Sequence, residues 1–169
     1  MNDVIAAIST AWGEGAIAIV RLSGEGSVAL ADRFFVGRKP LAARPPRYLA
    51  LGNIVDRANG GAVVDEVLAV RFAERSSYTG EEAVEVHCHG GAAAAQRCLE
   101  IFLREGARLA QPGEFTKRAF LSGRIDLAQA EAVQSVIRAR SDAALRSAER
   151  SLQGQLSSEL HGLMDALTR

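Results

Sequence analysis

The carboxyl-terminal part of the chain differs from the rest in its content of proline and glycine. From Asp126 onward there is no proline and there are only two glycines, whereas both residue types interrupt the earlier sequence repeatedly. Apolar residues here follow one another at steps of three and four: Leu145, Ala148, Leu152, Leu156, Leu160, Leu163 and Leu167. Such steps place side chains on one face of an α-helix. The pattern predicts one long helix that begins with Asp126 as its N-cap and carries a continuous apolar stripe.

This predicted helix is longer than the roughly 25 residues that globular helices seldom exceed without a break. We therefore expect it to bend near Gly154 or to belong to a bundle of several helices. A stripe of leucines needs other helices to pack against, and the remaining sequence offers no obvious candidate. We expect the partners to come from a second copy or from sequence beyond residue 169, so the chain is interpreted as a fragment or a truncated relative of a longer protein.

The first 120 residues alternate short strand-like runs with short helical ones, which predicts an α+β fold. Strands are expected at 15–24, 48–56, 65–72, 83–89 and 107–110, and helices at 27–35 and 92–106. The Asn59-Gly60 step favours positive φ and predicts a hairpin or near-hairpin between two of the strands. We accordingly divide the chain into residues 1–120, the α+β part, and residues 121–169, the first part of a helical domain.

Composition narrows the possible functions. Lys plus Arg and Asp plus Glu each number 20, so the formal net charge is zero. Proteins that hold nucleic acid unaided usually carry a basic excess, because phosphate contacts supply most of the affinity. We therefore expect any contact with nucleic acid to depend on a partner or on further sequence. The two cysteines suggest no disulfide framework, and no secretory signal or apolar run of about 20 residues is recognisable. No membrane association is expected, and the cytoplasm is the expected location.

The stretch Ser77–Gly91, SYTGEEAVEVHCHGG, concentrates the polar groups that could form a site. In a strand, side chains alternate between faces, so Glu85, His87 and His89 share one face, and the intervening apolar residues face the core. Two histidines could bind zinc, but Cys88 points the other way and no second pair of ligands follows. The sequence therefore predicts no metal site.

A double glycine before a helix can offer backbone N–H groups to a phosphate. However, the chain contains neither G-x-x-x-x-G-K-[ST] nor G-x-G-x-x-G, so no nucleotide-binding loop is predicted. Glu85 remains. A carboxylate fixed on a rigid strand can accept two parallel hydrogen bonds from a planar donor edge, such as a guanidinium group or the N–H/NH₂ side of a pterin or guanine ring. Considered alone, Glu85 is better interpreted as a solvated glutamate on a strand face.

Four blocks occur in order along the chain: AISTAWGEGAIAIVRLSG, SYTGEEAVEVHCHGG, QPGEFTKRAFLSGRIDLAQAEAV and RSAERSLQGQLS. Together they resemble the amino-terminal region of the MnmE family of tRNA-modifying GTPases, also called TrmE. The resemblance spans essentially all 169 residues. It implies a fold similar to the tetrahydrofolate-binding fold of the glycine-cleavage T protein, with a mixed β-sheet and packed helices.

The resemblance also implies a function. The first domain of this family forms a homodimer and holds 5-formyltetrahydrofolate or 5,10-methylenetetrahydrofolate. A helical domain follows, into which a GTP-binding domain is inserted, and only that domain uses GTP, magnesium and potassium. With an FAD-dependent partner, MnmG or GidA, the full-length protein modifies the wobble uridine of certain tRNAs at C5. This chain contains no GTP-binding motif, so its own enzymatic activity is left open.

Three positions match the folate contacts of the family: Arg21 in AIVRLSG, Glu85 in AVEVHCHGG and Arg124 in LSGRIDL. Glu85 is expected to pair with the donor edge of the pterin. Arg21 and Arg124 carry planar guanidinium groups, which can donate two parallel hydrogen bonds to a carboxylate such as the glutamate tail of folate. Arg124 stands where the family often has lysine, which keeps the charge and changes the geometry. No catalytic residue is assigned.

Two other functions remain open from the sequence. One is a purely structural module that dimerises and docks the flavin-dependent partner without binding folate. The other is a stand-alone one-carbon transferase like the glycine-cleavage T protein. The second would need a catalytic carboxylate and a surface for a carrier protein, and the sequence identifies neither.

Overall fold

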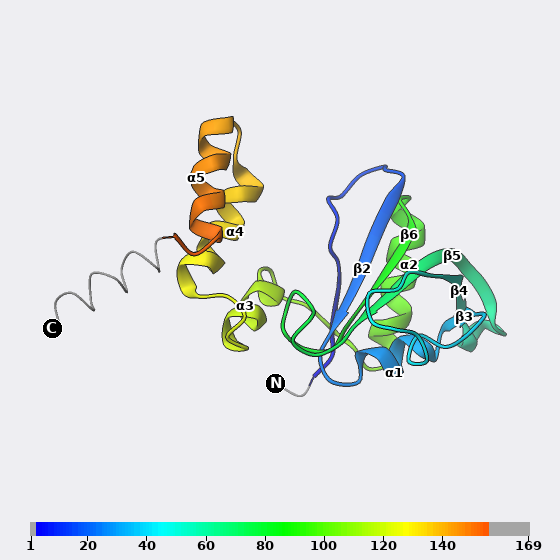
Figure 1. Cartoon of the computed structure of the whole chain (residues 1–169). Coiled ribbons are helices and arrows are strands. Elements are labelled where there is room, and N and C mark those ends of the chain that lie inside the picture. The colour runs from blue at the N-terminus through cyan, green and yellow to red at the C-terminus, as the bar shows by residue number, and fades with distance from the viewer. Residues whose placement is uncertain (1–2, 156–169) are drawn as a thin grey trace, which may run out of the picture. The chain divides into compact units, whose positions relative to one another are not determined.

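The computed structural model describes residues 3–155, which form two compact units (Figure 1). The first unit runs to Ser77 and continues through Glu81–Pro112, and it contains the β-sheet. The second consists of Tyr78–Gly80 and the chain from Gly113 onward, and its described residues form helices joined by short turns. The predicted division into domains at residue 120 stays a prediction.

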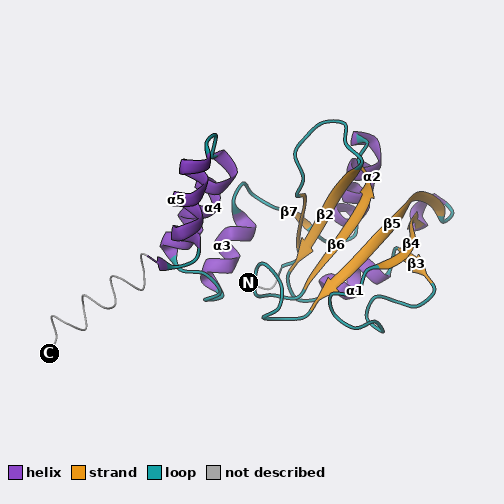
Figure 2. Ribbon diagram, turned by 45° about the horizontal axis from the view of Figure 1, so that its top comes forward, coloured by secondary structure: helices purple, strands orange, loops and turns teal. Residues whose placement is uncertain are grey.

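The first unit is built on a seven-stranded sheet in the order β3-β4-β5-β6-β2-β1-β7 (Figure 2). The strands are β1 Ile5–Ile8, β2 Ile17–Ser23, β3 Phe35–Gly37, β4 Ala50–Asp56, β5 Ala62–Phe72, β6 Ala83–His89 and β7 Arg108–Leu109. Neighbouring strands run antiparallel except for β1 and β7, which are parallel. The expected α+β class with a mixed sheet is therefore confirmed.

Alternation along β2 and β6 decides which face of the sheet is buried. Val20 and Leu22 of β2 and Val84 and Val86 of β6 are fully shielded from solvent. They pack in one apolar cluster with residues of helices α1 (Ser27–Asp32) and α2 (Ala92–Arg104). Both helices therefore cover the same face of the sheet (Figure 2). The polar residues between these strand positions point to the opposite face, as the period of two requires.

The turn between β4 and β5 confirms the predicted hairpin and adds a short helix to it. A 3-10 turn, η1 Arg57–Asn59, follows β4, and Asp56 caps it by accepting a hydrogen bond from the Ala58 backbone N–H. Gly60 then has φ 65°, in the left-handed region that glycine enters without steric cost. The Asn-Gly step supplies this conformation, so the turn forms where the sequence predicted it.

Two elements near the amino terminus differ from the sequence-based prediction. The helix expected at 27–35 ends at Asp32, and β3 begins at Phe35, because Phe34 and Phe35 turn into the core. Strand β1 was not predicted. It has the short sequence IAAI, whose two alanines give a weak strand signal, and it is held between β2 and β7.

Up to residue 155, the second unit contains three helices: α3 Glu114–Leu121, α4 Leu127–Arg138 and α5 Asp142–Leu152. Asp126 caps α4, as predicted, and forms a complete capping box with Gln129. The helix expected from Asp126 is interrupted earlier than predicted, because Ala139 adopts the extended ψ of 127° and the Ser141 hydroxyl accepts from the Ala144 N–H at the start of a new helix. The serine hydroxyl competes for backbone N–H groups and starts α5. The break expected near Gly154 is present, since α5 ends at Leu152 and Gly154 has φ 79°. Residues 156–169, including the last four leucines of the stripe, lie outside the described residues.

Between residues 3 and 155, no helix has the combined length and apolar character needed to cross a membrane.

Candidate functional site

Strands β2 and β6 place two of the predicted site residues side by side. Arg21 is directly opposite Glu85 in the antiparallel register. The Nε and Nη2 atoms of Arg21 lie 2.9 and 2.8 Å from Glu85 Oε1. Both side chains are half-buried on the face of the sheet that α1 and α2 leave open, with 23% and 17% of their surfaces exposed. The structure therefore brings Arg21 and Glu85 together as one charged pair.

The second oxygen of Glu85 is not held by Arg21. Oε2 lies 3.5 Å from His87 Nε2, which is an ion-pair distance only when the imidazole is protonated. His87 Nε2 is inaccessible to solvent and has no hydrogen-bond partner among the described residues. A carboxylate can accept about four hydrogen bonds, and the two contacts from Arg21 use one oxygen. Oε2 thus keeps capacity for donors of a bound ligand.

His89 lies further along β6, and its partner was not predicted from the sequence. Its Nδ1 is 2.6 Å from Asp65 Oδ1, and its backbone N–H donates to Asp65 Oδ2 at 2.8 Å. The hydrogen bond with Asp65 raises the pKa of His89, and the negative charge of the same carboxylate adds to the shift. Asp65 is on β5, so only the pairing of β5 with β6 could have revealed this contact.

The double glycine after β6 has a structural explanation. The Gly90 N–H donates to Ala16 O at 3.1 Å, and Gly90 O accepts from Gly15 N–H at 3.2 Å. A Cβ at position 90 would overlap the carbonyl oxygen of Gly15. Gly90 is therefore required where the loop before β2 meets the end of β6.

In the described part of the chain, no group of three or more His, Cys, Asp or Glu side chains is arranged to hold a metal ion.

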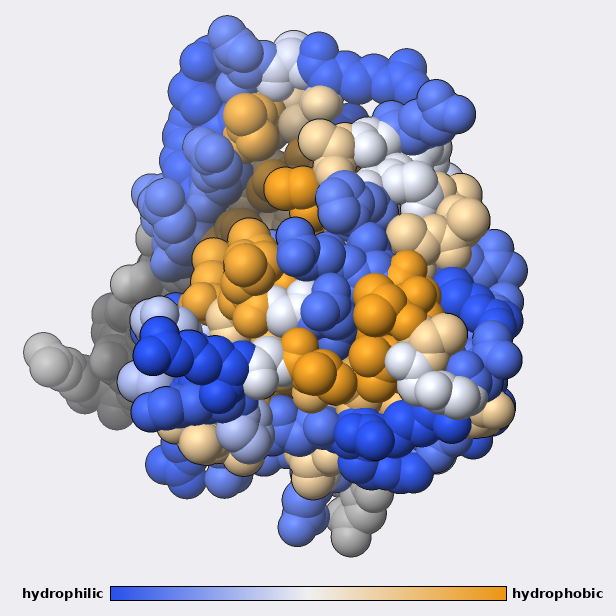
Figure 3. Space-filling model, turned by 90° about the vertical axis from the view of Figure 1, so that its right-hand side faces the viewer, coloured by the Kyte–Doolittle hydropathy of each residue, from blue (hydrophilic) through white to orange (hydrophobic). Residues whose placement is uncertain are grey.

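The open face of the sheet also carries a hollow of about 240 Å³ next to the histidines. Its walls include His87 and His89 together with the apolar residues Ile17, Leu51 and Leu68. These three apolar side chains are 59%, 60% and 40% exposed. Figure 3 views the molecule from the side on which Figure 1 draws β3, β4 and β5, and apolar side chains gather there in groups bordered by hydrophilic ones. Such exposure is typical of a surface that binds a ligand or another protein.

The third predicted residue, Arg124, belongs to the second unit. Its Nη1 donates to the backbone oxygen of Tyr78 at 2.8 Å, and its guanidinium lies 5.6 Å from the centre of the Tyr78 ring. Tyr78 Oη is 2.9 Å from Thr116 Oγ1 of α3. Tyr78 of the motif SYTG therefore contacts both α3 and the motif that contains Arg124. The structure pairs Arg124 with Tyr78 and Arg21 with Glu85.

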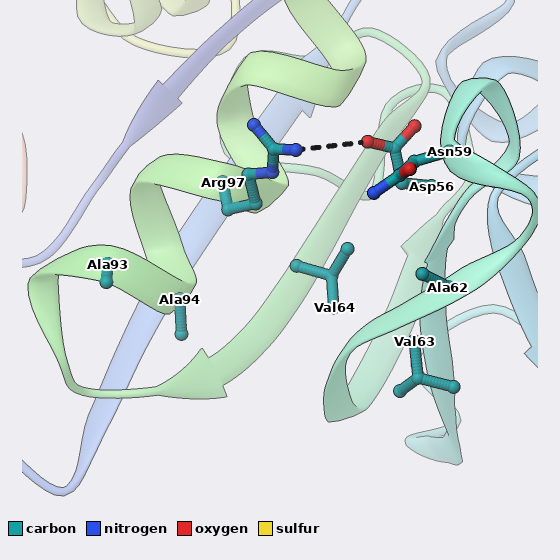
Figure 4. A pocket seen from close by; sticks show the side chains of 8 residues that line it. All are labelled: Asp56, Asn59, Ala62, Val63, Val64, Ala93, Ala94 and Arg97. Carbon is teal, nitrogen blue, oxygen red and sulfur yellow. Dashed lines mark hydrogen bonds and ion pairs between the residues drawn. The ribbon is translucent and has the colours of Figure 1, made fainter.

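A second hollow, of about 350 Å³, lies between α2 and the β4–β5 hairpin (Figure 4). Asp56 is almost fully buried beside it, 2.6 Å from Arg104 Nη2 and 3.4 Å from Arg97 Nη2. The hydrogen bond from Arg104 is the main reason why the pKa of Asp56 is lowered. The carboxylate also accepts from the Ala58 N–H. Its bonding capacity is used to tie α2 to the hairpin, which indicates a structural role.

Comparisons with known proteins agree with the sequence motifs. The sequence model of the family described as GTP-binding protein TrmE N-terminus matches residues 4–124. The tRNA modification GTPase MnmE of Carboxydothermus hydrogenoformans is 51% identical over 165 residues, which is 96% of this chain and 36% of the relative. The protein of the same name from Shouchella clausii is 49% identical over 98% of this chain and 36% of its own length. The chain thus spans about a third of the length of these relatives.

Proposed function

The chain belongs to the family of the GTP-binding protein TrmE N-terminus, and we propose that it is the folate-binding and dimerising module of a GTPase that modifies wobble uridine in tRNA. In this function it delivers a one-carbon unit from 5-formyltetrahydrofolate or 5,10-methylenetetrahydrofolate to C5 of the uridine. The two relatives described above carry the name tRNA modification GTPase MnmE, which supports the assignment to tRNA modification. The proposed location is the cytoplasm.

The observation that carries the proposal is the Arg21–Glu85 pair on the open face of the sheet. Arg21 fixes the plane of the Glu85 carboxylate through Oε1 and leaves Oε2 able to accept hydrogen bonds. The pterin ring of folate offers an N–H and an NH₂ group on one edge, which suits a fixed carboxylate. Glu85 would hold that edge and Arg21 would orient Glu85. Arg124 would supply a positive charge for the glutamate tail, and tetrahydrofolate would supply the one-carbon unit.

The proposal includes partners outside this chain. A second copy would form the homodimer, and an FAD-dependent protein of the MnmG or GidA type would carry out the redox chemistry with tRNA as substrate. GTP, magnesium and potassium would act only in a GTP-binding domain of a full-length member.

Calorimetry with 5-formyltetrahydrofolate tests the folate assignment. We expect the chain to bind it and Glu85→Gln to weaken binding at least about tenfold, because a neutral amide replaces a charge-assisted acceptor. Glu100→Gln removes the same charge from the exposed side of α2 and serves as the matched control. Equal affinities of Glu85→Gln and wild type would remove Glu85 from the site.

The exposed apolar side chains of Ile17, Leu51 and Leu68 favour a second candidate function, that of a structural module which dimerises and docks a partner without binding folate. Analytical ultracentrifugation separates the two. A dimer that Leu68→Glu dissociates, in a chain with no measurable affinity for folate, would favour the structural module. A dimer that also binds folate would support the first proposal.

A further inference from the structure

Positive charge is concentrated in two segments of the first unit. Residues 38–48 contain Arg38, Lys39, Arg44 and Arg47 and no acidic residue, and residues 71–76 add Arg71 and Arg75 with one glutamate. Six basic residues and one acidic residue give these segments a net charge of +5, in a chain whose total charge is zero. The zero net charge therefore conceals a strongly uneven distribution.

The fold joins the two segments into one surface. The Arg47 N–H donates to Arg71 O at 2.8 Å, and Arg71 Nε donates to Arg44 O at 2.8 Å. Arg47 Nη2 donates to Ser76 O at 3.0 Å. The loop between β3 and β4 thus lies against the end of β5 and the turn after it. We call the six side chains the basic surface: Arg38, Lys39, Arg44, Arg47, Arg71 and Arg75.

None of these six side chains forms an ion pair with a carboxylate in the described part of the chain. The hydrogen bonds of Arg44, Arg47 and Arg71 go to backbone carbonyl oxygens instead. A carbonyl group positions a guanidinium without cancelling its charge, and each guanidinium has five donors. By contrast, Arg33, Arg97, Arg104 and Arg108 of the same unit all pair with acidic residues. Three arginines of the basic surface are therefore positioned by carbonyl groups, and none of its six charges is paired with a carboxylate in the described part of the chain.

The loop that carries most of this charge has a restricted backbone. Three of the four prolines in the chain, Pro40, Pro45 and Pro46, lie in it, and proline fixes φ. Arg47 and Arg75 have φ of 64° and 63°, and among the described residues they are the two non-glycine residues with positive φ. This backbone conformation costs on the order of 1 kcal/mol for each L-residue. The fold therefore maintains both arginines at a cost to stability.

We propose that the basic surface binds the phosphate backbone of RNA. The inference rests on the proposed function in tRNA modification, which makes an RNA the natural polyanion. Five of the six cations are arginines, whose planar forks match phosphate oxygens better than an ammonium group does. Tyr48 is 52% exposed beside Arg44, whose guanidinium lies 5.5 Å from the ring centre, and an exposed aromatic ring can stack on an unpaired base.

The test measures binding of a fluorescent tRNA transcript to the chain by anisotropy, from about 50 to 200 mM salt. The variant Arg38→Gln/Lys39→Gln/Arg75→Gln removes three positive charges whose side chains make no hydrogen bond in the part of the chain that the structure describes. The control Arg138→Gln/Arg146→Gln/Arg150→Gln makes the same change in net charge on exposed positions of the helical unit. Circular dichroism establishes that both variants are folded.

We expect the basic-surface variant to bind tRNA at least about tenfold more weakly at the lowest salt. The slope of log K against log salt should fall by about two to three, because each lost phosphate contact removes about 0.7 to 0.9 from it. The control should keep most of the affinity and slope. Equal losses in both variants would overturn the inference, since net charge alone would explain them. Tighter binding of polyglutamate than of tRNA would assign the surface to an acidic protein and also overturn it.

Folate affinity, measured on the same variants, separates this inference from the proposed function. The basic surface contains neither Arg21 nor Glu85, so its variant should bind 5-formyltetrahydrofolate like wild type. Loss of RNA binding with folate binding retained supports both proposals. A chain that never binds folate but loses RNA binding in the basic-surface variant supports the inference and removes the folate assignment.

Discussion

The two units of the molecule use their apolar residues in different ways. The sheet unit buries one face of β2 and β6 completely under α1 and α2, with large side chains such as Phe34 and Phe102 at its centre. In the described part of the helical unit, the buried apolar residues are alanines: Ala119, Ala132 and Ala148. Its larger apolar side chains, including Leu127 and Ile137, are 60% and 78% exposed. The sheet unit therefore contains its own core, whereas the described part of the helical unit leaves large apolar side chains exposed.

The largest expected effect tests this difference directly. Phe102→Ala removes a ring that packs edge-to-face on Phe34 at 6.2 Å, and it should lower the free energy of unfolding by about 3–5 kcal/mol. Ile137→Ala on α4 should change it by less than about 0.5 kcal/mol, because that side chain is exposed. Urea denaturation followed by circular dichroism measures both. A cost of several kcal/mol for Ile137→Ala would mean that α4 is covered in solution, and the comparison would fail.

The next effect is electrostatic and depends on pH. In the sheet unit, Asp56 holds α2 to the β4–β5 hairpin through Arg104 and Arg97. The pKa of Asp56 is lowered in the folded state, chiefly by the Arg104 hydrogen bond. Its contribution to stability is therefore fully present above the unfolded pKa of about 4 and is lost as pH falls through the lower folded value.

Asp56→Asn should consequently destabilise the chain at about pH 7, and the difference from wild type should shrink at about pH 3. Urea midpoints at the two pH values measure this change. Asp142→Asn in the first turn of α5 is the matched control in the helical unit, because Asp142 has no ion pair in the described structure and should show a smaller dependence. A pH-independent effect of Asp56→Asn would show that the side chain acts through packing alone.

The sequence predicts features that depend on neighbouring residues, and it does not predict contacts between residues that are distant along the chain. The strict alternation of AVEVHCH determines which side chains face the core, so the placement of Glu85, His87 and His89 could be predicted. The Asp126 cap is local and could be predicted as well. The partnership of His89 with Asp65, and of Asp56 with Arg104, could not, because each joins residues brought together only by strand order or helix packing. The break at Ala139 could not be predicted because neither proline nor glycine marks it.

The cap of α4 sharpens the comparison at a smaller scale. Asp126→Ala should cost about 1 kcal/mol of local helix stability, because the Asp126 carboxylate accepts from the Gln129 N–H at 2.8 Å. The Asp126 backbone N–H in turn donates to Gln129 Oε1 at 2.9 Å. Hydrogen exchange of α4 amides should quicken by about fivefold, whereas amides of β2 and β6 should keep their rates. Asp126→Asn keeps an acceptor and should largely preserve protection. Faster exchange in the sheet would show that the two units unfold together.

The smallest effect concerns strain within the sheet unit. Arg75→Gly should raise the free energy of unfolding by about 0.5 kcal/mol, since glycine removes the cost of φ 63° but gains entropy in the unfolded chain. Arg38→Gly, at a residue without positive φ, is the control and should be neutral or slightly destabilising. The same Arg75→Gly variant loses one charge of the basic surface, so it should be more stable and bind tRNA more weakly. A stabilised variant with unchanged affinity for tRNA would mean that the strained backbone at Arg75 serves the turn after β5 rather than the binding of RNA. A destabilised variant would mean that the Arg75 side chain stabilises the sheet unit despite its exposure.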